Sequence, residues 1–303
     1  MEFVDSDYIL TMKSLIVANW KMNPQTLKEA EHLFNTVVKG IKNIKGAEVV
    51  FCPPLVFISN IRYLSQSLRR DTLLRRVASR LDPATLSRKR IVLQISKIRL
   101  GNIKLGGQNC FWEQEGAYTG EISPSMLKSL GCEYVIIGHS ERKKYFGETD
   151  ETINKKLKSA FKARLKPILC IGENTRGSFN SRGRYFNEIG EILEEQIKKA
   201  LLGIPASKVQ DLTVAYEPVW VIGTGLPVTP DDALSASIFI RKVVSNNYNK
   251  KTAKSIRVLY GGSVDAKNVA SFIREEGVNG VLVGGASVNA SEFIKIIENL
   301  SRS

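Results

Sequence analysis

The chain has 303 residues and a formal net charge of +14, and 43% of its residues are hydrophobic. A chain of this length buries roughly three-quarters of its unfolded surface, so one large domain or two smaller ones can form a substantial core. No apolar run is long enough to span a membrane, and the acidic N-terminus lacks the features of an export signal. With two histidines and four cysteines without Cys-x-x-Cys spacing, we expect a cytoplasmic protein with no metal site and no disulfide framework.

Short apolar runs alternate with amphipathic stretches along the chain. The runs are rich in Val, Ile and Leu without polar alternation, which is typical of strands buried on both faces of a parallel sheet. The expected strands are 15–18, 49–52, 103–110, 134–137, 167–171, 212–216, 256–260 and 280–283. The expected helices include 26–39, 151–165, 185–202, 231–247, 265–276 and 291–300.

Eight strand-then-helix units predict an α/β protein with a closed (β/α)8 barrel. We expect a single domain over residues 13–303, preceded by an N-terminal extension of residues 1–12. A doubly wound open sheet is the alternative, but that fold normally has a Gly-x-Gly-x-x-Gly turn after its first strand. Asn19-Trp-Lys-Met-Asn-Pro follows the first strand instead.

Polar residues and glycine turns follow the expected strands. In a barrel of this kind the chemistry takes place at the carboxyl ends of the strands. The residues at these ends are Asn19 and Lys21, His139 to Arg142, Glu217, Gly261 to Ser263, and Gly284 with Gly285. The two glycine turns lead into helices, where backbone N–H groups hold phosphate. Lys21 adds a full positive charge for an anionic substrate, although an ordinary surface lysine is the alternative.

Glu217 stands directly after the sixth expected strand and before an apolar segment, 219–222. Gly223 and Gly225 give this segment flexible joints, so that it can close over the carboxylate and exclude water. Exclusion of water makes a carboxylate a stronger base. His139 is placed to polarise a carbonyl group and to move protons between oxygens. The alternative for Glu217 is a surface loop in which the glutamate has no function. The alternative for His139 is a buried histidine whose hydrogen bonds are all made within the core.

Five blocks of the sequence, taken in order, resemble the signature blocks of triosephosphate isomerase. They are Asn19-Trp-Lys-Met-Asn, Gly138-His-Ser-Glu-Arg, Tyr216-Glu-Pro-Val-Trp with Ile222-Gly-Thr-Gly, Tyr260-Gly-Gly-Ser and Val283-Gly-Gly-Ala-Ser. The resemblance implies the TIM-barrel fold, no cofactor, and interconversion of dihydroxyacetone phosphate and glyceraldehyde 3-phosphate through an enediol(ate).

The resemblance also implies roles for individual residues. Glu217 is then the catalytic base, His139 the electrophile, and Lys21 and Asn19 contact the substrate. The supporting residue is Glu141, and the phosphate is bound by Gly223, Ser263, Gly284 and Gly285. In the family, the long loop after the third strand inserts into a second subunit. There its threonine, Thr119 in this chain, supports the site by contacting the catalytic residues of the partner. The full length of the loop here implies a homodimer, and a loop packed on its own monomer is the alternative.

Three features depart from the family pattern. The flap ends in Leu226-Pro227, which puts its motion in doubt, and Lys143 stands where a second arginine often follows. The third is an Arg-rich insertion, residues 69–99, between the second helix and the third strand. It holds ten basic residues against two acidic ones, +8 of the net +14. One interpretation of the insertion is a solvent-exposed amphipathic segment with no binding role. The other is a basic surface that binds nucleic acid or an anionic membrane. The alternative function is therefore a barrel scaffold that carries this binding segment.

Overall fold

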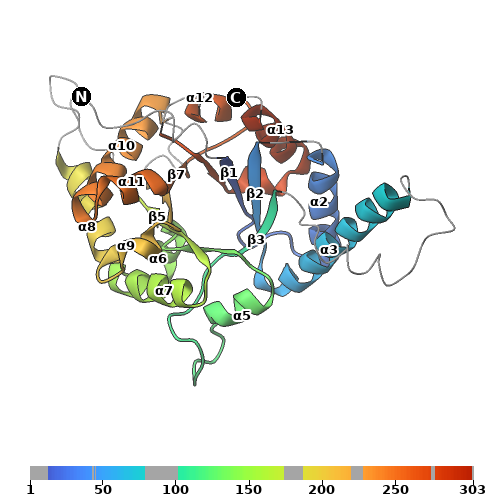
Figure 1. Ribbon diagram of the computed structural model, residues 1–303, viewed down its shortest axis with the longest axis horizontal. Coiled ribbons are helices and arrows are strands. Elements are labelled where there is room, and N and C mark those ends of the chain that lie inside the picture. The colour runs from blue at the N-terminus through green and yellow to red at the C-terminus, as the bar shows by residue number, and fades with distance from the viewer. Residues whose placement is uncertain are drawn as a thin grey trace.

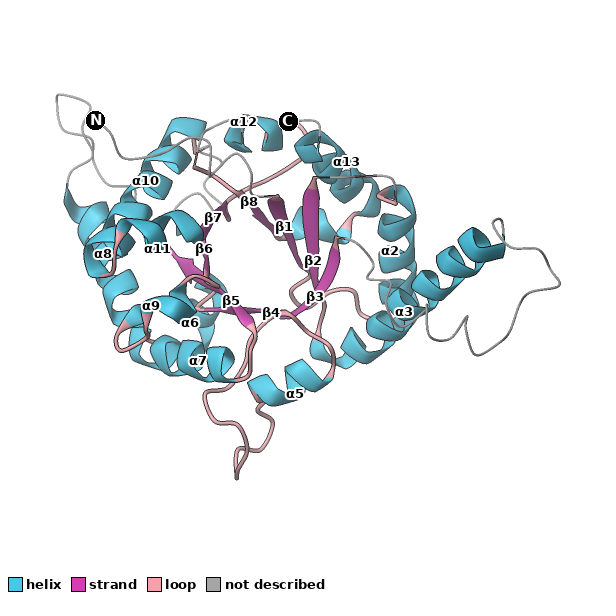
Figure 2. Ribbon diagram, viewed as in Figure 1, coloured by secondary structure: helices cyan, strands magenta, loops and turns pink. Residues whose placement is uncertain are grey.

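The computed structural model describes residues 13–42, 44, 46–78, 102–173, 187–219, 228–273 and 277–301. Within these residues, parallel strands pair in chain order and close into a barrel, because β8 also pairs with β1. Helices surround the barrel on its outside (Figures 1 and 2). The strands are β1 Ser14–Asn19, β2 Ala47–Cys52, β3 Ile103–Gly107, β4 Tyr134–Ile137, β5 Lys166–Ile171, β6 Thr213–Tyr216, β7 Arg257–Tyr260 and β8 Gly280–Val283. The predicted (β/α)8 barrel is confirmed.

The helices begin at local capping signals in the sequence. Thr26 and Thr229 each form a capping box with the third residue of the helix that follows, and Pro230 occupies the first turn. The helical elements are α2 Leu27–Gly40, α3 Leu55–Ala78, α5 Pro124–Ser129, α6 Ser140–Phe146, α7 Asp150–Lys162, α8 Asn187–Leu201, α9 Ala206–Val209, α10 Pro230–Asn247, α11 Lys250–Ser255, α12 Val269–Ile273, the 3-10 helix η3 Gly285–Val288 and α13 Ala290–Ser301. No helix in the described ranges is long and apolar enough to cross a membrane.

Alternate residues of each strand face the two sides of the barrel wall. Leu15 and Val17 of β1 belong to a cluster that fills the interior, whereas Ile16 and Ala18 pack in the layer between strands and helices. The interior cluster is Leu15, Val17, Val50, Cys52, Tyr134, Ile136, Ile168, Cys170, Ala215, Leu259 and Leu282. The barrel is therefore a packed core, and its functional groups must lie at an end.

Several predicted boundaries are wrong. The third strand ends at Gly107, three residues before the predicted end at Cys110. The helix predicted to reach residue 165 ends at Lys162, and Arg164 has a left-handed φ of 58°. The helix predicted from residue 265 begins at Val269.

The predicted insertion, 69–99, lies only partly within the described residues. Its first ten residues continue α3, which runs without a break from Leu55 to Ala78, so the helix does not end where the insertion was predicted to begin, at residue 69. In Figure 1 this end of α3 extends beyond the ring of helices. The predicted extension 1–12, the flap residues 220–227 with Gly223, and residues 79–99 of the insertion lie outside the description.

Candidate active site at the carboxyl end of the barrel

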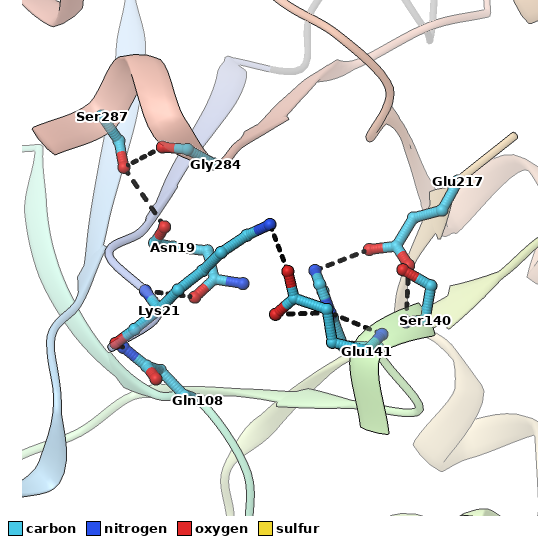
Figure 3. A network of polar contacts seen from close by, with 9 residues as sticks. Asn19, Lys21, Gln108, Ser140, Glu141, Glu217, Gly284 and Ser287 are labelled. Carbon is cyan, nitrogen blue, oxygen red and sulfur yellow. Dashed lines mark hydrogen bonds and ion pairs between the residues drawn. The ribbon is translucent and has the colours of Figure 1, made fainter. Parts of the chain in front are cut away.

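Residues from five strand ends converge on one cavity of about 280 Å³. Its walls include Asn19 and Lys21 after β1, His139 after β4, Glu217 after β6, Ser263 after β7, and Gly284 with Gly285 after β8. The structure thus brings together the ammonium, imidazole and carboxylate groups that the sequence singled out, although they are far apart in the chain. Figure 3 shows several of these side chains and the interactions between them.

Lys21 has a backbone conformation that a residue with a side chain rarely adopts, with φ of 54°. Such a conformation costs on the order of 1–3 kcal/mol and persists only where the surroundings enforce it. The N–H of Lys21 donates to Asn19 Oδ1 at 3.1 Å, and Gln108 Nε2 donates to the Lys21 carbonyl at 2.8 Å. Gln108 Nε2 also donates to the carbonyl of Cys52, at the end of β2. Side chains from two strand ends therefore hold the Lys21 backbone from both sides.

The Lys21 side chain crosses the mouth of the barrel toward Glu141, and its Nζ donates to Glu141 Oε1 at 2.5 Å (Figure 3). A β-carbon placed on Gly284 would lie 3.1 Å from Lys21 Cε. Glycine at 284 leaves room for the lysine to pass. The carboxylate of Glu141 is thereby held at the entrance of the cavity as the partner of the ammonium group.

His139 caps the N-terminus of α6. Its Nδ1 accepts the backbone N–H of Glu141 at 3.3 Å, so this ring nitrogen is engaged as an acceptor and Nε2 is the one left to donate. The Nε2–H group points into the site, 3.3 Å from Glu217 Oε1. The imidazole is therefore placed as a hydrogen-bond donor toward the site.

Glu217 is almost completely buried, with 3% of its surface exposed. Its Oε2 accepts the backbone N–H of Ser140 at 2.9 Å, which draws the carboxylate toward the N-terminus of α6 (Figure 3). Two glycines leave space for Glu217. A β-carbon on Gly172 would lie 1.7 Å from the backbone carbonyl oxygen of Glu217, and a β-carbon on Gly261 would lie 3.0 Å from its side-chain Cγ. Burial and the neighbouring Glu217 carboxylate raise the pKa of the Cys170 thiol, which therefore stays protonated.

The glycine turn after β8 leads directly into η3. Within it, Ser287 Oγ donates to the Gly284 carbonyl at 2.6 Å and lies 3.3 Å from the Asn19 carbonyl. This fully buried hydroxyl joins the end of β1 to the turn at Gly284 and Gly285. The backbone at the expected phosphate position is therefore fixed relative to Lys21.

Thr119, in contrast, is not brought to the cavity. It is exposed on the loop after β3, which projects beyond the ring of helices in Figures 1 and 2, and the cavity walls do not include it. Two residues of the network were missed by the sequence interpretation: Gln108 and Ser287. The position of Gln108 directly after a strand was a usable signal, whereas the link from Ser287 to β1 joins residues 268 positions apart.

Comparisons with known proteins fit this arrangement. The family model described as triosephosphate isomerase matches residues 14–73 and 83–300. Curated triosephosphate isomerases from Dictyoglomus turgidum and Aquifex aeolicus are each 40% identical to the chain, over 95% and 94% of it and 99% of each relative. The crystal structure of triosephosphate isomerase from Bartonella henselae matches with a TM-score of 0.71 at 30% identity, covering 96% of this chain and all of that one. The unmatched segment, 74–82, is shorter than the predicted insertion 69–99.

Proposed function

The chain belongs to the triosephosphate isomerase family and interconverts dihydroxyacetone phosphate and D-glyceraldehyde 3-phosphate, a step of glycolysis and gluconeogenesis; we propose that Glu217, His139 and Lys21 carry out this reaction. The comparisons favour this activity over the alternative of a barrel scaffold whose Arg-rich segment binds nucleic acid. The observation that supports our assignment is that these three side chains line one cavity.

Glu217 is the base that removes a proton from the carbon next to the substrate carbonyl. To reach that carbon, its carboxylate leaves the backbone N–H of Ser140, which it accepts at 2.9 Å in this structure. Its burial, with 3% of its surface exposed, keeps bulk water away from the atoms that exchange the proton. A positioned general base typically contributes about 10²–10⁴-fold to the rate.

His139 stabilises the oxygen on which negative charge develops. Its Nε2–H donates to the enediolate oxygens, since the other ring nitrogen is occupied by the N–H of Glu141. A fixed donor of this kind is worth about 2.7–4 kcal/mol in the transition state. Lys21 supplies the positive charge that balances the bound anion, and Glu141 holds the ammonium in place.

The phosphate group lies against Ser263, Gly284 and Gly285, with Asn19 beside it. Backbone N–H groups at a glycine turn and at the start of η3 suit a phosphate. Gly223, which lies outside the described residues, is the further N–H donor that we propose from the family resemblance. Because the phosphate does not react, its binding energy serves to orient the reacting end of the substrate.

The assembly is a homodimer in the cytoplasm, formed through the loop around Thr119. Large apolar side chains near the carboxyl end of the barrel support a dimer, because they are exposed in the single chain: Met22 is 83% exposed and Phe146 is 68% exposed. Tyr118, next to Thr119, is 45% exposed. Exposed apolar groups of this size suit a protein interface. Analytical ultracentrifugation should show a mass twice that of the chain, and Tyr118→Asp together with Phe146→Asp should shift it to the monomer.

The catalytic assignment is tested by a coupled assay on glyceraldehyde 3-phosphate with the parent and Glu217→Gln. The amide keeps the size of the side chain but cannot take the proton. We expect kcat to fall by at least about 10³-fold while the thermal midpoint changes little. Glu191→Gln, at an exposed position on α8, is the matched control and should retain parental activity. A Glu217→Gln enzyme within tenfold of the parent would rule out this residue as the base.

A further inference from the structure

Asp265 places a carboxylate on the wall of the cavity that binds an anion. It follows Ser263 by two residues, and both line the cavity together with Asn268. Among the ion pairs of the described residues, none includes Asp265. An unpaired negative charge beside the proposed phosphate position opposes phosphate binding. The presence of Asp265 on this wall therefore cannot be explained by a gain in affinity for phosphate.

The carboxylate of Asp265 is held in place by the turn that presents Ser263. Its Oδ1 accepts the N–H groups of Lys267 and Asn268, both at 2.8 Å. Asn268 accepts the N–H of Asp265 at 2.9 Å and donates to the Ser263 carbonyl at 3.1 Å. The turn is also tied to α13, because the N–H of Ala266 donates to Glu292 Oε1 at 2.7 Å. The charge therefore has a fixed position relative to Ser263.

The described walls of the cavity carry few positive charges. Lys21 is the one Lys or Arg among them, and Glu141 already pairs with it at 2.5 Å. Glu217 and Asp265 are the two carboxylates on the same walls. A single phosphate is held mainly by neutral N–H donors and shares Lys21. A second phosphate group would find no further cation on these walls and would meet the Asp265 carboxylate.

We propose that Asp265 is a specificity-determining residue, whose charge admits ligands with one phosphate group and disfavours anions that carry a second one. The excluded class comprises sugar bisphosphates and similar polyanions. This inference rests on the proposed placement of the phosphate beside Ser263, Gly284 and Gly285. The competing explanation is that Asp265 serves only to cap the turn 265–268.

The Asp265→Asn variant separates the two explanations, because the amide oxygen still accepts the N–H groups of the turn while the charge is removed. Dissociation constants for inorganic phosphate and for pyrophosphate are measured by isothermal titration calorimetry at low ionic strength. We expect binding to tighten by about threefold for phosphate and about tenfold for pyrophosphate, since the second phosphoryl group adds to the repulsion that is removed. The gain should shrink at 0.5 M salt, where the Debye length is about 4 Å.

A matched control removes the same charge elsewhere. Asp211→Asn lies at an exposed position before β6, at the opposite end of the barrel, and should leave both constants within the error of the parent. Asp265→Ser, a second neutral residue that can cap the turn, should reproduce the shift in the pyrophosphate-to-phosphate ratio. If both Asp265 variants keep the parental ratio, Asp265 has no role in specificity.

A further variant distinguishes this inference from the proposed function itself. Lys21→Met removes the cation, so phosphate affinity should fall by at least about tenfold if the phosphate binds in this cavity. An unchanged affinity in Lys21→Met would overturn the proposed placement of the substrate. A weakened Lys21→Met together with an unaltered ratio in Asp265→Asn would overturn only the role of Asp265.

Discussion

The two ends of the barrel interior use polar side chains in opposite ways. At the amino end, Tyr134 donates to Glu48 Oε1 at 3.0 Å, and Arg257 donates to Glu48 Oε2 at 3.0 Å. These residues come from β4, β2 and β7, and they pair with one another across the interior. At the carboxyl end, Lys21 has a strained backbone, and Glu217, the base that we propose, accepts a single backbone N–H among the described residues, that of Ser140. The comparison indicates that paired groups close one end for stability, and that the other end keeps its groups ready to react.

Breaking the amino-end cluster should give the largest loss of stability. The change is Arg257→Met, which removes the guanidinium and leaves Glu48 unpaired with only 14% of its side chain exposed. Unpairing a buried charge costs about 3–5 kcal/mol, and partial exposure places this case at the low end, about 2–3 kcal/mol. Urea denaturation at fixed protein concentration measures the free energy of unfolding, and kcat/KM should stay within twofold of the parent.

The double variant Glu48→Gln with Arg257→Met is the control for that prediction. It removes both charges, so much of the lost stability should return. A tenfold loss of kcat/KM in Arg257→Met, with unchanged unfolding, would contradict the division of roles between the two ends.

At the carboxyl end, Gln108→Leu should reduce activity more than stability. The substitution removes the amide that donates to the carbonyls of Lys21 and Cys52 and that helps to hold the strained Lys21 backbone. We expect kcat/KM to fall by about 10- to 100-fold, which corresponds to about 1.4–2.7 kcal/mol, because a relaxed Lys21 moves its ammonium away from the substrate. Steady-state kinetics measures the change, and the thermal midpoint should drop by only a few degrees.

Gln25→Leu is the matched control for this variant. Gln25 Nε2 also donates to a carbonyl of the same turn, that of Met22, at 2.8 Å, but at an exposed position. This variant should keep parental kinetics. Equal activity losses in the Gln25 and Gln108 variants would show that the Lys21 backbone does not depend on Gln108.

The sequence predicted the barrel because buried parallel strands are nearly continuous apolar runs, and this signal is local. Reliance on apolar runs also explains an error at β2. The strand was predicted to begin at Val49 but begins at Ala47, because Glu48 interrupts the apolar run although it faces the barrel interior. Its partners are Tyr134 and Arg257, and no local pattern reports a pairing across 209 residues.

The site was predictable to a different extent. Glycine turns and polar residues after strands identified Lys21, His139 and Glu217, because a barrel places all carboxyl strand ends on one rim. The backbone strain at Lys21 and the bridge from Gln108 to the Cys52 carbonyl could not be predicted, because both depend on how the ends of β1, β2 and β3 fit together. The acceptor role of His139 Nδ1 follows from its position as a helix cap, which only the structure shows.

The smallest predicted effect concerns Asn279, just before β8, and the buried guanidinium of Arg241 on α10. Arg241 Nη1 donates to the carbonyls of Ala253 and Ile256, and Nη2 donates to Asn279 Oδ1 at 2.6 Å. Burial lowers the pKa of Arg241 to about 10, which means that the folded protein disfavours its charge. Asn279→Asp keeps the oxygen and adds a countercharge, so this hydrogen bond becomes one between two ions.

Hydrogen bonds between charged groups are worth about 1 kcal/mol more than those with a neutral partner. The thermal midpoint of Asn279→Asp should therefore rise by about 2–4 °C, since 1 kcal/mol shifts it by that amount in a domain of roughly this size. Activity should not change, because Asn279 lies at the amino end. If the midpoint falls instead, desolvation of the new carboxylate outweighs its attraction to Arg241. A rise in the midpoint with altered kcat/KM would show that the two ends are mechanically coupled, which a barrel filled with rigid side chains does not require.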